Sequence, residues 1–112
     1  RSIGVDIETI KRVTPKLHGT LFRPDEIAAL QAQPDTAAAI VFSAKEAGFK
    51  AIFPIGGTFI GFQEASIALD WTHQQFRIRY HGAHEPNKAL ESGVGHWRLT
   101  HDHVLTFFSI QE

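Results

Sequence analysis

The prediction of the fold starts from residues 36–53, which read TAAAIVFSAKEAGFKAIF. Asp35 or Thr36 is a suitable N-cap, and the mainly apolar run that follows is typical of a helix packed against other elements. Pro54 removes a backbone donor, so we expect the helix to end near Phe53. The sequence therefore predicts one long helix in the middle of the chain.

Charged side chains interrupt this apolar helix within two turns. Glu46 stands between Lys45 and Lys50, with Phe42, Phe49 and other apolar residues around the same stripe. A Glu46–Lys50 pair at i,i+4 is the simple structural explanation, and such a pair contributes only a few tenths of a kcal/mol when exposed. Charges held beside apolar side chains usually have a partner or a function, so this stripe is also a candidate site.

The first strand-like segment carries acids on one side only. Apolar and polar residues alternate in SIGVDIE, residues 2–8, which is the pattern of a half-buried strand. Asp6 and Glu8 share one face, about 6.6–6.8 Å apart along the strand. The ordinary interpretation is a solvated polar face, with the apolar side chains turned inward.

The remaining segments complete a small α+β pattern. A broken helical pattern covers residues 16–32, and the later strands are expected at 58–62, 65–71, 76–80, 97–100 and 104–110, with a surface loop at 81–95. We condense this order to β-α-α-β-β-β. It predicts helices packed on one face of a mostly antiparallel sheet.

Composition limits the classes of function. The 112 residues suit a single domain, and 11 basic against 12 acidic residues give no general attraction to nucleic acid. No apolar run approaches the roughly 18 residues that a membrane span requires, and cysteine is absent. We therefore expect a soluble, cytoplasmic domain with no nucleic-acid or membrane partner.

Taken together, strand and helix offer a set of hard oxygen ligands. Asp6 and Glu8 from the strand and Glu46 from the helix suit Mg²⁺, which binds carboxylates together with water and substrate phosphates. Lys45 and Lys50 beside them could contact phosphate oxygens as point charges. This combination is typical of a site that handles phosphoryl groups.

The two motifs, GVDIE at 4–8 and FSAKEAGFK at 42–50, resemble the paired signature of the 4′-phosphopantetheinyl transferases. The continuation KAIFPIGGTFIGFQEASI is similar to the larger, Sfp-type branch, and within it to siderophore-synthase members of the enterobactin synthase component D type. The acid at Glu8 favours this branch, because the single-domain holo-acyl-carrier-protein synthases lack an acid at that place.

The resemblance implies a reaction and roles for these residues. A carrier-protein serine attacks the β-phosphate of coenzyme A, and 3′,5′-ADP leaves. Asp6, Glu8 and Glu46 are the implied Mg²⁺ ligands, and Lys50 the implied contact to the coenzyme A pyrophosphate. Glu46 is also the implied base for the serine, directly or through water, and Lys45 assists with phosphate.

The resemblance extends only to the second, metal-binding half of the two-half enzymes. Residues 1–112 therefore represent either a fragment, which we favour, or a chain whose two copies pair so that one replaces the other half. The implied partners are coenzyme A, a carrier domain of siderophore or other nonribosomal peptide synthesis, and that second half or copy. A module that binds coenzyme A or a carrier domain without transfer is the alternative function.

Overall fold

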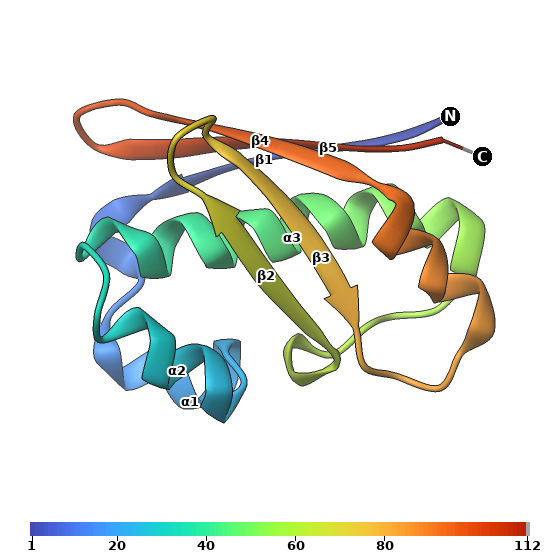
Figure 1. The fold of residues 1–112 in the computed structure, drawn as a ribbon, viewed down its shortest axis with the longest axis horizontal. Coiled ribbons are helices and arrows are strands. Elements are labelled where there is room, and N and C mark those ends of the chain that lie inside the picture. Colours follow the sequence, from blue (N-terminus) through green and yellow to red (C-terminus); the bar gives the residue numbers. More distant parts are fainter. Residues whose placement is uncertain (112) are drawn as a thin grey trace.

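The computed structural model describes residues 1–111 (Figure 1). Three α-helices and five strands follow one another, together with short 3₁₀ segments. The elements are β1 (Ser2–Thr9), η1 (Ile10–Arg12), η2 (Pro15–Leu17), α1 (His18–Leu21), α2 (Pro24–Leu30), α3 (Thr36–Gly56), η3 (Phe62–Glu64), β2 (Ala65–Asp70), β3 (Gln75–Tyr80), η4 (Glu85–Ser92), β4 (Val94–Leu99) and β5 (His103–Ile110). The predicted α+β class is confirmed.

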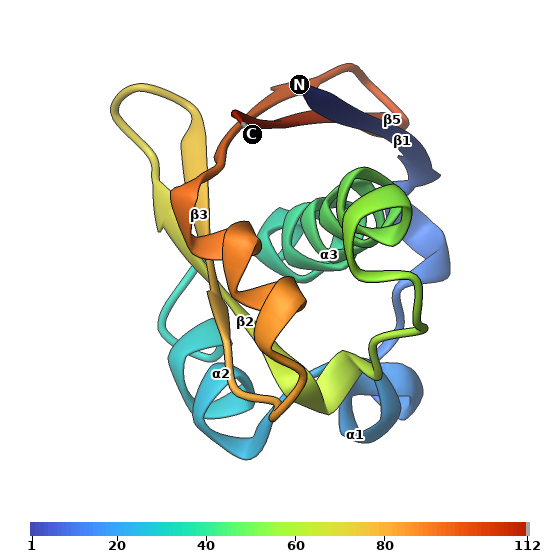
Figure 2. The same ribbon diagram turned by 90° about the vertical axis from the view of Figure 1, so that its right-hand side faces the viewer.

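The sheet is antiparallel throughout and bends around α3. Its strand order is β1-β5-β4-β3-β2, so the N-terminal strand lies at one edge, paired along its length with the C-terminal strand. β3 and β4 pair only at Gln75–His96 and Phe76–Gly95, and the β2–β3 hairpin turns away there. Figure 2 shows the result, with strands on two sides of α3 and the short helices α1 and α2 below it.

The core lies between α3 and the concave face of the sheet. α3 contributes small side chains, including Ala39, Ala44, Ala47 and Ala51, all buried. The sheet contributes large ones, among them Trp97, Phe76 and Phe108, and the latter two rings stack at 5.7 Å. Small residues on the helix therefore let the bulky sheet side chains close over it.

β1 packs unusually close to α3 at Gly4. A Cβ atom at this position would overlap the carbonyl oxygen of Ala47. Glycine therefore allows the strand backbone to touch the helix backbone. This contact brings the rest of that strand face, including Asp6, against α3.

The buried face of β1 is the reverse of the ordinary expectation for an alternating strand. Gly4 and Asp6 face α3 and are buried, while Ile3, Val5 and Ile7 are 48%, 55% and 59% exposed. The solvated-acid interpretation of this strand is therefore wrong. The helix can lie against the acidic face because Gly4 has no side chain and Asp6 finds hydrogen-bond partners there.

The predicted long helix is confirmed, with a different C-terminus. α3 continues past Pro54, and Gly56 is its last residue. The next residue, Gly57, is the C-cap, with a left-handed φ of 71° and an N–H that donates to the carbonyl of Phe53. Proline removes one donor but fits inside the last turn, and the left-handed glycine provides the stop. Among the described residues no helix is long and apolar enough to cross a membrane.

Two connecting segments differ from the predictions. The strand expected at 58–62 is wrong, because these residues form a loop that runs into η3. The loop expected at 81–95 contains η4, which buries Asn87 and Leu90 against the core, and its last residues begin β4. The strands expected at 65–71 and 76–80 and the closing hairpin are confirmed, with shifts of a few residues at their ends.

The contact at Gly4 gives a test of the packing. Gly4→Ala forces β1 away from α3, and we expect it to lower the free energy of unfolding by about 3 kcal/mol or more. Gly19→Ala is the matched control, since a Cβ there meets nothing within 4 Å and should change stability by less than about 1 kcal/mol. Urea denaturation followed by circular dichroism measures both; equal stability of the two variants would contradict the close packing.

Candidate active site

Asp6 is the centre of a polar cluster between β1 and α3. Its carboxylate is 6% exposed. Oδ1 accepts a hydrogen bond from Lys50 Nζ at 3.0 Å, and Oδ2 accepts one from Ser43 Oγ at 2.9 Å. A strand acid is thus fixed by two side chains of the central helix.

Ser43 and Thr106 form a buried hydrogen-bonded pair next to Asp6. The sequence analysis did not identify either of them as a site residue. Both are buried, and Thr106 lies directly across from Asp6 in the β1–β5 register. Thr106 Oγ1 donates to the carbonyl oxygen of Ser43 at 3.0 Å. Ser43 stands inside the motif FSAKEAGFK, but only the strand register could have identified Thr106.

Glu8 and Glu46 bring two more carboxyls to this cluster, as the sequence predicts. Burial is the main cause that raises the pKa of Glu8 from its ordinary 4.5 to about 7, and a hydrogen bond and repulsion from Asp6 add to it. Burial also raises the pKa of Glu46, and the charge of Asp6 adds to this effect while Lys50 opposes it. Three acids therefore share a site that has too little positive charge to keep all of them ionised.

Lys50 is the cation of this cluster. Its side chain is 53% exposed, and its ammonium donates to the carbonyl oxygen of Val5 at 2.9 Å as well as to Asp6. The i,i+4 pair with Glu46, the simple structural explanation, is absent from the ion pairs of residues 1–111. Lys50 instead joins helix to strand, and its exposure leaves it able to reach a ligand.

Lys45 lies outside the cluster. It is fully buried, and Nζ donates to Glu26 Oε1 at 2.6 Å and to the carbonyl oxygens of Leu21 at 3.0 Å and Phe62 at 2.8 Å. Burial lowers the pKa of its ammonium, and the contact with Glu26 opposes that shift. All three donors are used, so this position offers nothing to the phosphate that the sequence led us to expect at Lys45.

An apolar cavity of about 360 Å³ opens beside Glu46 and Lys50. Aromatic side chains form most of its wall, and Phe53 and Phe59 pack at 5.7 Å while remaining 47% and 92% exposed. The other lining residues are Phe49, Thr58, Ile60 and Phe62. The cluster thus combines acids, a half-exposed cation and an adjacent apolar surface.

The acids have the donor chemistry of a hard-cation site, but they are not arranged around a common point. Carboxylate oxygens are the ligands that Mg²⁺ prefers, and burial together with repulsion from Asp6 raises the pKa values of Glu8 and Glu46. Within residues 1–111, however, no three His, Cys, Asp or Glu side chains form a group that could hold a metal ion. One oxygen of Asp6 is taken up by Lys50 in this arrangement.

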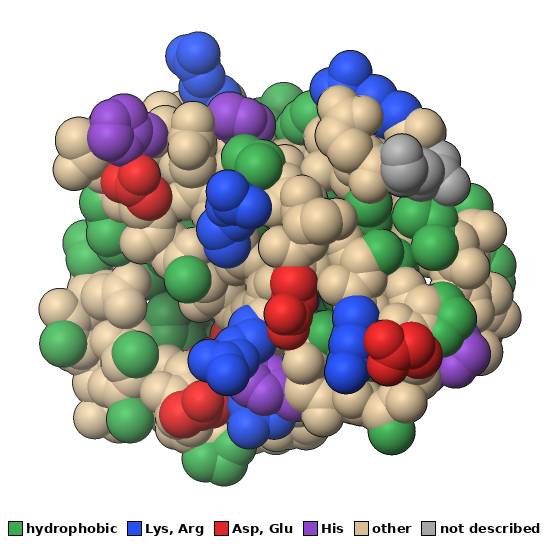
Figure 3. All heavy atoms as spheres, turned by 45° about the vertical axis from the view of Figure 1, so that its right-hand side comes forward, with side chains coloured by type: hydrophobic (Ala, Val, Ile, Leu, Met, Phe, Trp, Pro, Cys, Tyr) green, Lys and Arg blue, Asp and Glu red, His purple; other side chains and the backbone are tan. Residues whose placement is uncertain are grey.

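A second polar face lies over β3 and η4 and carries mixed charge. Figure 3 shows basic, acidic and histidine side chains interspersed on this face. A shallow hollow there is lined by Arg77, Arg79 and Lys88, but also by Glu91. Arg77 and Arg79 are exposed, as the alternation of β3 predicts.

The raised pKa of Glu8 predicts a pH-dependent stability. Between pH 4.5 and about 7 the folded protein holds a proton on Glu8 that the unfolded chain releases. The free energy of unfolding therefore falls as pH rises through that window. We compare the melting temperatures of Glu8→Gln and the unchanged protein in EDTA. The difference, variant minus unchanged protein, should be several degrees larger at pH 8 than at pH 5. Thermal melting measures the difference, and a pH-independent difference would show that Glu8 has an ordinary pKa.

Comparisons with known proteins identify the family of this chain. A model of the 4′-phosphopantetheinyl transferase superfamily matches residues 2–108. A search of curated proteins gives no match.

Solved structures show the same fold at low identity. The holo-[acyl-carrier-protein] synthase of Neisseria meningitidis superposes with a TM-score of 0.68 at 20% identity, covering 99% of this chain and 98% of that one. The coenzyme A complex of the Chronobacterium ammoniagenes synthase gives 0.64 at 20% identity with the same coverage. The Helicobacter pylori synthase with coenzyme A gives 0.62 at 15%, covering 97% and 99%. With the family model spanning nearly all of its length, the chain belongs to the 4′-phosphopantetheinyl transferase superfamily.

Proposed function

We propose that this chain transfers 4′-phosphopantetheine from coenzyme A to a serine of a carrier protein in a Mg²⁺-dependent reaction. The observation that carries the proposal is the meeting of Asp6, Glu8, Glu46 and Lys50 between β1 and α3. The family supports the reaction class, and related synthases are solved with coenzyme A.

Asp6, Glu8 and Glu46 are the residues that would hold Mg²⁺. The bound cation would neutralise charge that develops on the pyrophosphate. Lys50 would have to leave Asp6 Oδ1 for that oxygen to serve as a ligand. Because Lys50 is half exposed, its ammonium can then turn to the pyrophosphate oxygens.

Glu46 is the proposed base for the carrier serine, directly or through a water. The serine oxygen forms a bond to the β-phosphorus of coenzyme A, the bond from that phosphorus to the 3′,5′-ADP oxygen breaks, and the serine proton passes to Glu46. The raised pKa of Glu46 moves it toward the range in which a carboxylate accepts a proton near neutral pH. The neighbouring apolar cavity offers a surface for the uncharged pantetheine arm.

The finer assignment is the Sfp-type, enterobactin synthase component D-like branch. Its support is the acid at Glu8, which the structure places beside Asp6, and the segment FPIGGTFIGFQEASI that borders the cavity. The proposed substrate is then a carrier domain of siderophore or other nonribosomal peptide synthesis. A non-catalytic module that binds coenzyme A or a carrier domain is the second candidate, favoured by the Lys50–Asp6 contact that blocks a preformed metal site.

We further infer that the active unit includes a second folded unit, either another copy of this chain or a companion half of the same fold. The outer face of β1, β5 and β4 supports this, because large apolar side chains are exposed across it. They are Ile3, Val5, Ile7, Leu105 and Phe107. Val5 and Phe107 are cross-strand neighbours at the centre of this face.

Labelling of an apo carrier protein with a fluorescent coenzyme A analogue tests the transfer. We expect Mg²⁺-dependent labelling that falls at least about 100-fold in Glu46→Ala, the loss typical of a missing general base. Glu85→Ala is the matched control, since Glu85 is 81% exposed and pairs with Lys88 rather than with a residue of the cluster. Labelling that survives Glu46→Ala would refute the assigned site. Coenzyme A binding without any Mg²⁺-dependent labelling would favour the non-catalytic module.

The exposed sheet face gives a separate prediction about assembly. If two copies pair through it, Phe107→Glu should raise the dissociation constant of self-association at least about tenfold, because a charge would be buried at the interface. Light scattering across a concentration series measures this. Leu17→Glu is the control, because Leu17 is 41% exposed but lies outside the face. A monomer at all concentrations would leave the companion half as the proposed partner.

A further inference from the structure

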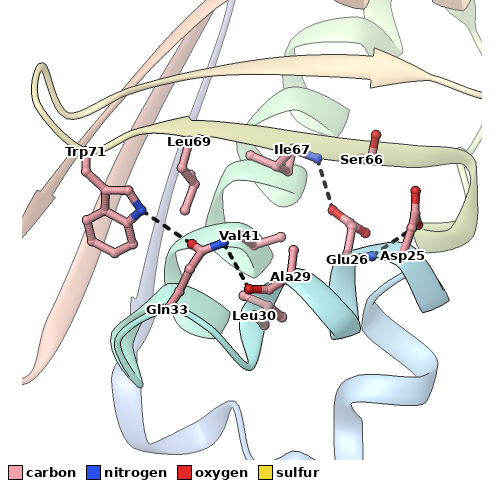
Figure 4. Close-up of a pocket in the computed structure, with 10 residues that line it drawn as sticks. All are labelled: Asp25, Glu26, Ala29, Leu30, Gln33, Val41, Ser66, Ile67, Leu69 and Trp71. Atoms are coloured by element: carbon pink, nitrogen blue, oxygen red, sulfur yellow. Dashed lines mark hydrogen bonds between the residues drawn. The ribbon is translucent and has the colours of Figure 1, made fainter.

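The buried pair of Lys45 and Glu26 is the most completely bonded charged contact in the described chain. Glu26 Oε1 accepts from Lys45 and from the backbone N–H of Arg23 at 3.0 Å. Glu26 Oε2 accepts from the backbone N–H of Ile67 at 3.0 Å, as Figure 4 shows at the edge of the cavity between α2 and β2. Both ions are therefore buried with their hydrogen-bonding capacity used, which a buried pair requires.

The pair joins the short elements around the middle of α3 to one another. Side-chain hydrogen bonds of Gln63 and Arg23 also link η3 to the α1–α2 segment. Through its own three bonds Lys45 ties α3 to the end of α1 at Leu21, to α2 at Glu26 and to η3 at Phe62. Glu26 extends the link to β2 through Ile67. The ion pair thus links four segments around the middle of α3, three through the ammonium and β2 through the carboxylate.

One of these links leads directly to the candidate active site. The carbonyl of Phe62 is held by Lys45, and the Phe62 ring packs at 5.8 Å from Phe42 and 5.6 Å from Phe49. Phe62 and Phe49 line the apolar cavity together with Glu46. Lys45 and Glu46 are adjacent, so the helix turns their side chains to different sides, one toward the clamp and one toward the cluster.

We propose that Lys45 is a positioning residue: its buried contact with Glu26 clamps η3 so that Phe62 forms the wall of the coenzyme A site beside Glu46. The inference rests on the proposed function for its ligand, while the clamp itself stands on the contacts above. Lys45 acts through Phe62 and touches no phosphate, in contrast to Lys50 on the exposed side of the same helix.

Nitrogen NMR of the lysine ammonium groups separates these two roles without any substitution. On addition of coenzyme A and Mg²⁺, the ammonium signal of Lys50 should shift, while that of Lys45 should stay and show no coupling to phosphorus. A phosphorus coupling to Lys45 would overturn the proposal.

Variants test the link to Phe62. Lys45→Met/Glu26→Met removes both charges, and we expect the Kd for coenzyme A to rise at least fivefold and the Phe62–Phe49 ring NOEs to weaken, with the dependence of binding on salt unchanged. Lys50→Met is the comparison, and it should reduce that salt dependence. Retained Phe62–Phe49 NOEs together with unchanged affinity in the double variant would overturn the clamp.

A milder variant covers the case in which the double variant does not fold. Phe62→Leu leaves the buried pair intact, so it should keep the Lys45 ammonium signal and still raise the Kd for coenzyme A about as much. Unchanged affinity in Phe62→Leu overturns the proposal. If the unchanged protein binds no coenzyme A, the proposed function fails, and the ring NOEs of the double variant decide the clamp alone.

Discussion

The backbone contact between β1 and α3 at Gly4 sets the geometry on which the site depends. Without a side chain at this position, the edge strand lies directly on the helix, and the next residue on the same face, Asp6, enters the interface. The cost of burying its carboxylate is met by hydrogen bonds from Ser43 and Lys50. A larger residue than glycine would separate the acids of the strand from those of the helix.

Burial and charge then act together at this interface. Asp6, Glu8 and Glu46 lie near one partly exposed lysine, and the pKa values of both glutamates rise, mainly through burial and further through repulsion from Asp6. In this arrangement Lys50 supplies positive charge to the acids through its contact with Asp6, and it lowers the pKa values of Glu8 and Glu46 against the effect of burial. Ser43 and Thr106 connect the strands to the helix beneath these acids, because Ser43 donates to Asp6 and Thr106 donates to the carbonyl of Ser43.

Part of this arrangement could be predicted from sequence. The motif at 4–8 alternates with the period of a strand, and the motif at 42–50 lies within a helical pattern. The strand period put Asp6 and Glu8 on one face, and the structure brings them near Glu46 of the helix, while their role in a site stays a prediction. Local patterns misled where tertiary contacts decide: the apolar side of β1 faces outward since α3 takes the acidic side, and residues 58–62 form a loop rather than a strand. Lys45 could not be placed, because its three acceptors come from segments 17 to 24 residues away.

The two lysines of one helix show how burial divides functions within a motif. Lys45 and Lys50 are five residues apart, which turns them about 140° from each other around the helix axis. One meets the carbonyls of α1 and η3 and the carboxylate of Glu26 and is fully bonded, while the other meets the edge strand and stays half exposed. A charge with no free donor can only hold structure, whereas an exposed charge with one displaceable partner can exchange it for a ligand. The same residue type therefore serves as a clamp on one side of α3 and, in the proposed function, as a binding group on the other.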